Sequence, residues 1–345
     1  MSPNNRFMSV FGAAPAQTPP PIWLMRQAGR YLPEYRAVRA EAGSFLQLCY
    51  TPSFAVEVTL QPIRRFDFDA AIIFSDILVI LDAMDRSLRF EVGEGPVLAP
   101  LEPGTALPPL ELGAQVERLA PVYAAIAETR AALAANKALI GFAGAPWTLA
   151  CYAVNGRGGS FDAAVLATMA SADWFQSLID DLTARVADHL CRQLDAGADA
   201  VQIFDSWAGA LDQVGFERWC IAPIRAIVDR VRAYAPNVPM IVFPRQAGSL
   251  LARFVAQLPD VAISVDQFAD LGAVRRTVGP KTVLQGNLDP LALVAGGEAL
   301  TQRWRQLAGT LAAGPHIVNL GHGIRQETPI AHVEHLITLV RDGSA

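Results

Sequence analysis

The stretch Trp174–Phe204, which reads WFQSLIDDLTARVADHLCRQLDAGADAVQIF, decides the fold because it holds a complete helix and the strand that follows it. Trp174–Ala196 has the apolar periodicity of a helix, and Ala200–Phe204 is a short apolar run typical of a buried strand. Glu117–Ala135 and Phe216–Tyr234 are further clear helical stretches. Alternating helices and strands predict a parallel sheet, because parallel neighbours must be joined by a long crossover connection.

Short apolar runs, each followed by a polar or glycine-containing turn, predict eight strands. They are Ile22–Met25, Ala70–Phe74, Leu139–Phe142, Ala200–Phe204, Met240–Phe243, Ala262–Val265, Thr282–Leu284 and His316–Leu320. The simplest closed arrangement of eight strand–helix units is a single-domain α/β fold, the (β/α)8 TIM barrel, over residues 21–345. An open doubly wound sheet is the alternative, and it would usually carry a G-x-G-x-x-G turn after its first strand. The turn here reads RQAGRYLPEYR and does not match that pattern.

Two segments lie outside this alternation. Residues 1–20 are predicted to form a flexible N-terminal arm. Phe90–Pro109 is rich in proline and glycine, so we expect an elaborated loop with a small hairpin.

The composition limits the class of protein. Of the 345 residues, 52% are hydrophobic and 18% charged, which predicts a large ordered core. The net charge of −5 argues against a nucleic-acid partner, which would normally require a basic surface. The N-terminal stretch has no apolar run long enough for a signal peptide, and no segment has the roughly 20 uninterrupted apolar residues of a membrane span, so we expect neither. The four cysteines show no C-x-x-C spacing, so we expect reduced thiols in a cytoplasmic protein.

Polar or charged residues follow nearly every predicted strand. Arg26, Asp76, Ser206, Arg245 and His322 are examples. In a (β/α)8 barrel these strand ends meet at one mouth, where active sites lie. Strand ends also meet ordinary polar turns, but that tendency does not require arginine or histidine there.

Arg26 and Arg30 are the sharpest feature of this mouth. Two guanidinium groups this close in sequence repel one another unless anions lie between them, and arginine binds carboxylates in a bidentate manner. They therefore predict a site for a polycarboxylate. The alternative is a structural ion pair between one of them and Glu34.

Asp76 ends the apolar run AAIIFSD, where an isolated carboxylate would be partly desolvated and costly. Either an arginine neutralises it, or it awaits a ligand that is cationic or carries N–H groups. We favour the ligand, because Phe74 suggests an apolar pocket wall. His322 is flanked by glycines that would let the backbone approach a ligand.

No pair of histidines has the spacing of a metalloenzyme motif such as H-E-x-x-H, and no phosphate-binding glycine loop is present in the sequence. We therefore predict neither a metal nor an organic cofactor.

Two long segments, PIWLMRQAGRYLPEYR at Pro21–Arg36 and GFAGAPWTLACYAV at Gly141–Val154, closely resemble the signatures of the uroporphyrinogen decarboxylase family. Four shorter segments fit the same family in order. They are IIFSDIL at Ile72–Leu78, QIFDSWAG at Gln202–Gly209, QGNLDP at Gln285–Pro290 and NLGHG at Asn319–Gly323. The resemblance spans essentially the whole chain after about residue 20.

This resemblance implies a (β/α)8 homodimer that works without metal or cofactor. The family converts the four acetate side chains of uroporphyrinogen III to methyl groups, giving coproporphyrinogen III and four CO₂ in porphyrin biosynthesis. The expected catalytic residues are Asp76, Arg26, Arg30, Tyr152 and His322. The expected substrate-binding residues are Arg26, Gln27, Ala28, Gly29, Arg30, Phe74, Asp76, Phe142, Tyr152, Phe204, Ser206 and His322. Among these, Asp76 would accept from the pyrrole N–H groups, and Phe142 and Phe204 would form apolar walls.

The chain departs from the family after two strands. Gln246 stands where relatives often carry glycine, and Gln267 where a tryptophan is common, so the role of Arg245 and its neighbours stays open. Two other functions also remain. A corrinoid-linked methyltransferase on the same fold would need zinc ligands that the sequence does not supply. A non-catalytic tetrapyrrole-binding protein would not need the full set of Arg26, Arg30, Asp76, Tyr152 and His322.

Overall fold

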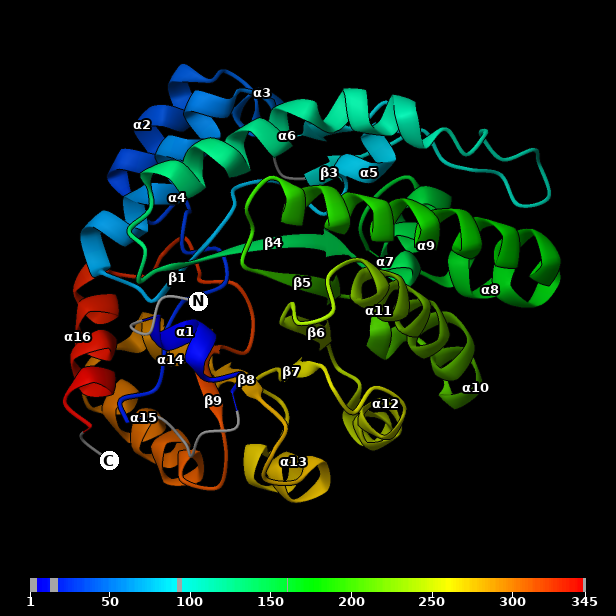
Figure 1. The fold of residues 1–345 in the computed structure, drawn as a ribbon. Coiled ribbons are helices and arrows are strands. Elements are labelled where there is room, and N and C mark those ends of the chain that lie inside the picture. Colours follow the sequence, from blue (N-terminus) through cyan, green and yellow to red (C-terminus); the bar gives the residue numbers. More distant parts are fainter. Residues whose placement is uncertain (1–4, 13–17, 92–94, 160, 344–345) are drawn as a thin grey trace.

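A parallel sheet forms the centre of the computed structural model, which describes residues 5–12, 18–91, 95–159 and 161–343. Within these ranges the sheet has seven strands, in the order β1-β4-β5-β6-β7-β8-β9. They are β1 (Ala70–Ile72), β4 (Ala138–Gly144), β5 (Ala200–Asp205), β6 (Met240–Pro244), β7 (Ala262–Ser264), β8 (Leu284–Leu288) and β9 (His316–Leu320). The sheet curls around its own axis, with the helices outside it (Figure 1). The chain is thus a single-domain α/β fold.

Each strand is followed by at least one helix before the next strand of the sheet, as the alternation predicted. The longer outer helices are α4 (Pro52–Phe66), α6 (Leu112–Ala132), α9 (Ala172–Asp195), α11 (Ala222–Tyr234), α15 (Gly297–Leu311) and α16 (Ile330–Arg341). The shorter ones are α2 (Pro33–Glu41), α3 (Phe45–Tyr50), α5 (Val79–Asp82), α7 (Pro146–Asn155), α8 (Asp162–Ala170), α10 (Gln213–Gly215), α12 (Leu251–Gln257), α13 (Leu271–Val278) and α14 (Pro290–Ala295). Proline at the first helical position begins α2, α4, α7 and α14, where its missing N–H costs no hydrogen bond.

The predicted first strand, Ile22–Met25, is not a strand of the sheet. Ile22 forms a single parallel bridge with Val318 of β9, and its carbonyl accepts a hydrogen bond from Asp69 N–H at 3.0 Å, just before β1. Beyond that bridge the chain turns away, because the N–H of Met25 donates to the Asn319 side chain at 2.9 Å. This segment nevertheless lies between the two edges of the curled sheet.

The seventh predicted strand, Thr282–Leu284, was also placed wrongly, since β8 runs over Leu284–Leu288. The prediction ended too early because Gln285 is a polar residue, although its side chain is fully buried. Gln285 Nε2 donates to Gln202 Oε1 at 3.2 Å and to Ser264 Oγ at 3.1 Å, and Gln285 Oε1 accepts from Trp23 Nε1 at 3.0 Å. A polar layer inside the sheet therefore breaks the apolar pattern that identifies strands.

Other irregular elements are close to expectation. The predicted small hairpin exists as β2 (Arg89–Glu91) paired with β3 (Gly95–Val97), while 92–94 lie outside the described residues. The helix predicted from Phe216 begins as a π-helical turn, η2 (Phe216–Ile221), before α11. Two short 3₁₀ turns, η1 (Ala208–Ala210) and η3 (Gly248–Leu250), follow β5 and β6.

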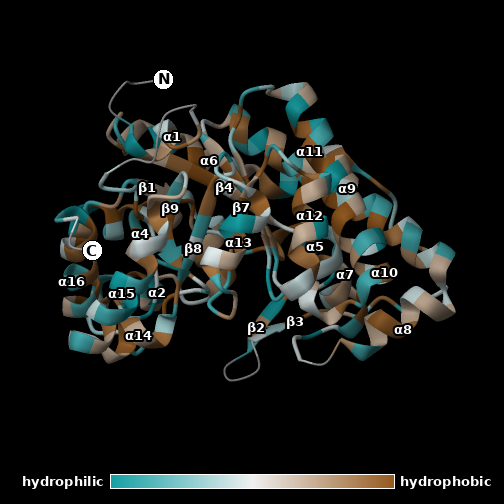
Figure 2. Cartoon of the chain, turned by 90° about the horizontal axis from the view of Figure 1, so that it is seen from below, coloured by the Kyte–Doolittle hydropathy of each residue, from teal (hydrophilic) through white to brown (hydrophobic). Residues whose placement is uncertain are grey.

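The described part of segment 1–20 includes a short helix, α1 (Arg6–Ser9). Phe7 is fully buried and belongs to a cluster with the first residues of several strands, Ala70, Ala138 and Ala200. Helix α1 therefore covers the amino ends of the strands, and Figure 2 shows it at the opposite end of the molecule from the β2–β3 hairpin. Residues 1–4 and 13–17 of this segment lie outside the described ranges.

Among the described residues, no helix combines the length and apolarity needed to cross a membrane. The four cysteines, Cys49, Cys151, Cys191 and Cys220, are buried and free.

Two buried histidines make the stability of the fold sensitive to acid. Burial lowers the pKa of His189, on α9, to about 3 and that of His316, at the start of β9, to about 4. Both stay neutral in the folded chain, whereas an unfolded chain protonates histidine below about pH 6.5. Because the unfolded state then binds more protons, stability should fall as the pH drops from about 6.5 to about 4, by about 1.4 kcal/mol per pH unit for each histidine. Denaturant unfolding across this range measures the slope. His316→Gln should make it shallower by one histidine's share, and an unchanged slope would contradict this account.

Candidate active site

The loop 24–30 carries the two predicted arginines and is held by its own side chains. Gln27 Oε1 accepts from Leu24 N–H at 3.1 Å, and Gln27 Nε2 donates to Ala70 O at 3.1 Å. Gln27 is 1% exposed, so its side chain braces the loop against β1. Arg26 has a left-handed backbone with φ 61°, and a Cβ at Gly29 would lie 2.8 Å from Arg26 O. The tight turn thus leaves Arg26 and Arg30 exposed while Gln27 is buried.

The loop after β9 is joined to this turn. Asn319 Oδ1 accepts from Met25 N–H, and Ile324 N–H donates to Met25 O at 2.8 Å. A Cβ at Gly323 would lie 2.4 Å from Arg26 Cδ, and one at Gly321 would lie 2.2 Å from Gln267 N. The glycines beside His322 were expected to let a ligand approach. In the structure they give room to neighbouring segments of the chain itself.

Asp76 lies in the turn between β1 and α5. Its Oδ1 accepts from Leu78 N–H at 2.8 Å, and the side chain is partly buried. Burial raises the pKa of Asp76, and this effect is opposed by the Leu78 N–H and by the positive charge of Arg26. Arg26 is thus near enough to act on the charge of Asp76, so residues that stand 50 positions apart in the sequence share one site.

His322 stands in the same electrostatic neighbourhood. Burial lowers its pKa to about 4, and the positive charges of Arg26, Arg245 and Arg325 act in the same direction. The imidazole is therefore neutral at pH 7, with one ring N–H available as a donor. It would meet an anion through a hydrogen bond rather than through a full charge.

Tyr152, on α7, also belongs to this group. Burial raises the pKa of Tyr152, with Asp76 adding to the rise and Arg26 opposing it. Its ring lies 6.3 Å from that of Trp207 and 6.2 Å from that of Phe161 in edge-to-face arrangements. The tyrosine is therefore fixed by aromatic neighbours and lies close to both the acid and the arginine.

The expected apolar walls fall into two groups. Phe142 and Phe204 end neighbouring strands and meet edge to face at 5.6 Å. Phe74 instead packs against Tyr35 and Phe45, each at 5.7 Å. All three expected phenylalanines are only partly buried, as is Ser206 after β5.

Glu34 was the alternative partner for one of the two arginines, but in the structure it pairs with a different residue. Glu34 pairs with Arg65, at 2.7 Å to Nε and 3.1 Å to Nη2, so Arg30 has no ion pair with any carboxylate that the structure describes. Arg36, an exposed residue of α2, donates from Nη1 to the carbonyl of Arg30 at 2.7 Å. Arg36 therefore holds the position of Arg30.

Two residues near the site were not singled out by the sequence. Arg39 is partly buried and close enough to lower the pKa of Cys49, a thiol on which Asp76 also acts. Asp205 is fully buried, burial raises its pKa to about 6, and it accepts from Thr148 Oγ1 at 2.6 Å. Asp205 thus has its partner within the buried interior. The position of Arg39 beside Cys49 depends on the packing of α2 and α3 against α4.

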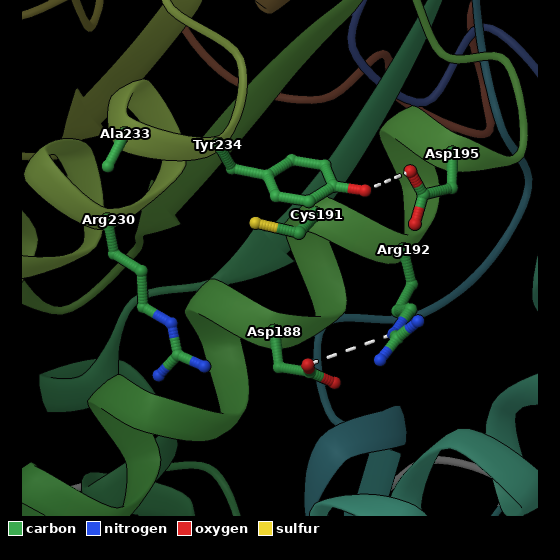
Figure 3. Close-up of a pocket in the computed structure, with 7 residues that line it drawn as sticks. All are labelled: Asp188, Cys191, Arg192, Asp195, Arg230, Ala233 and Tyr234. Carbon is green, nitrogen blue, oxygen red and sulfur yellow. Dashed lines mark hydrogen bonds and ion pairs between the residues drawn. The ribbon is translucent and has the colours of Figure 1, made fainter.

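A surface cavity of about 420 Å³ lies elsewhere, beside the last turns of α9 and α11. Its lining includes Asp188, Arg192, Arg230 and Tyr234 (Figure 3). These helices end where β5 and β6 begin, so the cavity opens near the amino ends of the strands. It is therefore separate from Asp76 and His322, which follow the carboxyl ends.

Among the described residues, no group of three or more His, Cys, Asp or Glu side chains is placed to hold a metal ion. The site instead joins one carboxylate, a neutral imidazole and arginines at the carboxyl ends of parallel strands. In an α/β enzyme, this arrangement would suit a ligand with anionic edges and a donor-rich or cationic centre.

Comparison with known proteins identifies the family. The model of the uroporphyrinogen decarboxylase (URO-D) family matches residues 2–343. A uroporphyrinogen decarboxylase from Chelativorans sp. strain BNC1 is 53% identical over 326 residues, covering 94% of this chain and 95% of the relative. One from Sphingopyxis alaskensis is 50% identical over 344 residues, covering 99% of each chain. The chain belongs to the uroporphyrinogen decarboxylase family, which confirms the predicted family and its carboxy-lyase activity.

Solved structures support the fold. A methyltransferase from Methanosarcina mazei superposes with a TM-score of 0.74 at 17% identity, covering 98% of both chains. A B12-independent methionine synthase from Shewanella sp. W3-18-1 gives a TM-score of 0.52 at 10% identity, covering 95% of this chain and 98% of that one. At such low identity these likenesses concern the fold alone.

Gly323 gives a direct test of how Arg26 is positioned. The added Cβ of Gly323→Ala must displace the Arg26 side chain, so kcat/KM for uroporphyrinogen should fall about tenfold or more, the value of one charge-assisted hydrogen bond. In an Arg26→Ala background the same change should do little, because the side chain it displaces is gone. Gly309→Ala on α15, where a Cβ meets nothing within 4 Å, is the matched control. Fully additive effects of the two substitutions would refute this coupling.

Proposed function

We propose that this chain binds uroporphyrinogen at the carboxyl ends of its parallel strands and removes the four acetate carboxyl groups. The observation that carries the proposal is the contact of the Arg26 side chain with Gly323, next to His322. The charge of the same arginine also acts on Asp76, Tyr152 and His322. A partly buried carboxylate that has no ion-pair partner in the described part of the chain matches the inward-pointing N–H groups of a reduced tetrapyrrole. The arginines around it match the carboxylates at the edge of the macrocycle.

The chemistry requires no electron acceptor beyond the substrate. Protonation of a pyrrole ring at carbon gives a cation, and the electron pair of the breaking C–CO₂ bond flows into that ring as CO₂ leaves. A proton then adds to the exocyclic carbon to form the methyl group, and loss of the ring proton restores the pyrrole. Asp76 stays ionised and stabilises the cation through the N–H groups, electrostatic assistance that is strong in a site shielded from water.

Each remaining site residue has a physical role in this scheme. Arg26 and Arg30 bind peripheral carboxylates, and neutral His322 donates a hydrogen bond to another. Ala28 and Gly29 keep the arginine loop tight, Gln27 anchors it to β1, and Tyr152 and Ser206 offer hydroxyl groups. The rings of Phe74, Phe142 and Phe204 supply the apolar surface for the macrocycle.

We further propose that the sheet closes into a barrel and that the chain forms a homodimer. Ile22 is joined to both edges of the sheet, because it forms a parallel bridge with Val318 of β9 and its carbonyl accepts from Asp69 N–H just before β1. These contacts support a closed (β/α)8 barrel with the 21–25 segment as its first strand. One catalytic domain covers residues 21–345, preceded by an arm that covers the amino ends of the strands. The active form is a cytoplasmic homodimer without a nucleic-acid or membrane partner.

The function is tested by anaerobic incubation of the purified chain with uroporphyrinogen III and chromatography of the products. We expect coproporphyrinogen III and CO₂ with no added cofactor, and full activity after treatment with a chelator. Tight tetrapyrrole binding without turnover would instead indicate a binding protein. Activity that is lost on chelation and restored by zinc would point to metal chemistry of the methyltransferase kind.

Asp76→Asn separates a catalytic role from a structural one. Asparagine is nearly isosteric but removes the charge and turns N–H donors towards the pyrrole N–H groups. The single-turnover rate should fall about 10²–10³-fold, as for loss of one preorganised electrostatic contact. Product affinity should fall less, since the arginines still bind the carboxylates. Asp85→Asn, at an exposed aspartate, is the control. Near-normal turnover of a folded Asp76→Asn chain would rule out the catalytic role.

A further inference from the structure

Arg245 follows β6 and has a backbone fixed on both sides. Its N–H donates to Asp205 O at 3.0 Å, and its carbonyl accepts from Gly209 N–H at 3.1 Å. Gln246, the next residue, has a left-handed φ of 60°, a conformation that glycine adopts at little cost, and its N–H donates to Asp266 Oδ2 at 2.6 Å. The loop that carries Arg245 is thus tied to its neighbours after β5 and β7.

The side chain of Arg245 is held less completely than its backbone. The guanidinium carbon lies 6.0 Å from the centre of the Trp207 ring, and Nη1 reaches Ser206 O at a long 3.4 Å. Nε is buried and has no hydrogen-bond partner among the described residues. Because a buried donor without an acceptor costs stability, this arrangement is expected where a ligand supplies the acceptor.

The carboxylate whose charge acts on Arg245, that of Asp266, is already engaged in hydrogen bonds to other residues. Asp266 is 6% exposed, and its two carboxylate oxygens already accept from Gln246 N–H at 2.6 Å and Phe268 N–H at 2.9 Å. Burial lowers the pKa of Arg245, Asp266 raises it, and Arg26 lowers it further. Arg245 and Arg26 both act on His322, whereas Arg26 and not Arg245 is among the groups that shift Asp76. Arg245 and Arg26 thus share the electrostatic surroundings of His322.

We propose that Arg245 is a third substrate-binding arginine, which holds a peripheral carboxylate of the tetrapyrrole from the β5–β6 side of the site. This inference rests on the proposed function. The charge of Arg26, and not that of Arg245, acts on Asp76, and this difference decides which carboxylate Arg245 holds. A guanidinium paired with a departing acetate would favour the charged starting state and oppose its conversion to CO₂. An arginine placed away from the ring cation instead suits a carboxylate that is retained in the product. Arg245 thus sets affinity and orientation, and Trp207 supports its guanidinium plane.

The test compares Arg245→Met with Arg325→Met. Methionine keeps much of the length of the side chain and removes its charge. Arg325 also acts on His322, but it is exposed and pairs with Glu327 at 2.7 Å, so its replacement controls for a general loss of positive charge. Affinity for coproporphyrinogen III is measured anaerobically by quenching of tryptophan fluorescence. The single-turnover rate with saturating uroporphyrinogen III is measured on the same preparations.

For Arg245→Met we expect the product Kd and the substrate KM to rise about ten- to a hundredfold, the effect of one charge-assisted contact. The saturated single-turnover rate should stay within about threefold of the wild type. Arg325→Met should change all three values by less than about threefold. Arg245→Lys should restore only part of the affinity, because lysine keeps the charge without the planar fork.

Three results would overturn the assignment. The first is wild-type product affinity in Arg245→Met, and the second is a fall in rate without a fall in affinity. The third is a loss of Tm with normal binding by the folded fraction, which would make Arg245 a structural partner of Trp207. Turnover of uroporphyrinogen by the wild-type chain is measured first. Its absence would overturn the proposed function as well, whereas normal turnover with unchanged Arg245→Met affinity would overturn this inference alone.

Discussion

The joint between the first and last segments of the chain is the constraint on which the site depends. Val318 N–H donates to Pro21 O at 2.8 Å, Asn319 Oδ1 accepts from Met25 N–H at 2.9 Å, and Ile324 N–H donates to Met25 O at 2.8 Å. These bonds satisfy backbone groups that would otherwise be buried without partners. They also bring the side chain of Arg26 across Gly323, directly beside His322. Residues almost 300 positions apart thereby form one binding surface.

The electrostatics of that surface depend on charged side chains that form no ion pair within the described residues. The structure shows no ion pair to a described carboxylate for Arg26, Arg30 or Arg245, and Glu34 is occupied by Arg65. Asp76 is likewise left with a single backbone donor, the N–H of Leu78. Such an arrangement costs stability in the free enzyme, but its charges remain available to a ligand. An anionic rim around an N–H-bearing centre, as in a reduced tetrapyrrole with carboxylate arms, would satisfy both kinds of group at once.

The sequence predicted most of this architecture where local pattern and packing agree. β5 and β9 were found because Ala200–Asp205 and His316–Leu320 are short apolar runs buried on both faces. The prediction failed where a tertiary contact replaced local preference. In the predicted strand Ile22–Met25, the N–H of Met25 bonds to the side chain of Asn319 and not to a neighbouring strand. In β8, Gln285 is polar and yet buried inside the sheet. The roles of Gly323 and Arg36 were also out of reach, because each depends on what another segment places beside it.

The central claim is that Asp76 acts as an anion in the site. Burial raises its pKa, and the Leu78 N–H and the charge of Arg26 oppose that rise. The most direct measurement is infrared difference spectroscopy of wild-type and Asp76→Asn chains across a pH series. At pH 7 the difference should contain the carboxylate bands of ionised Asp76, replaced by a protonated carboxyl band only at acidic pH. A protonated carboxyl band at pH 7 would contradict the account, because a neutral acid cannot stabilise a pyrrole cation by charge.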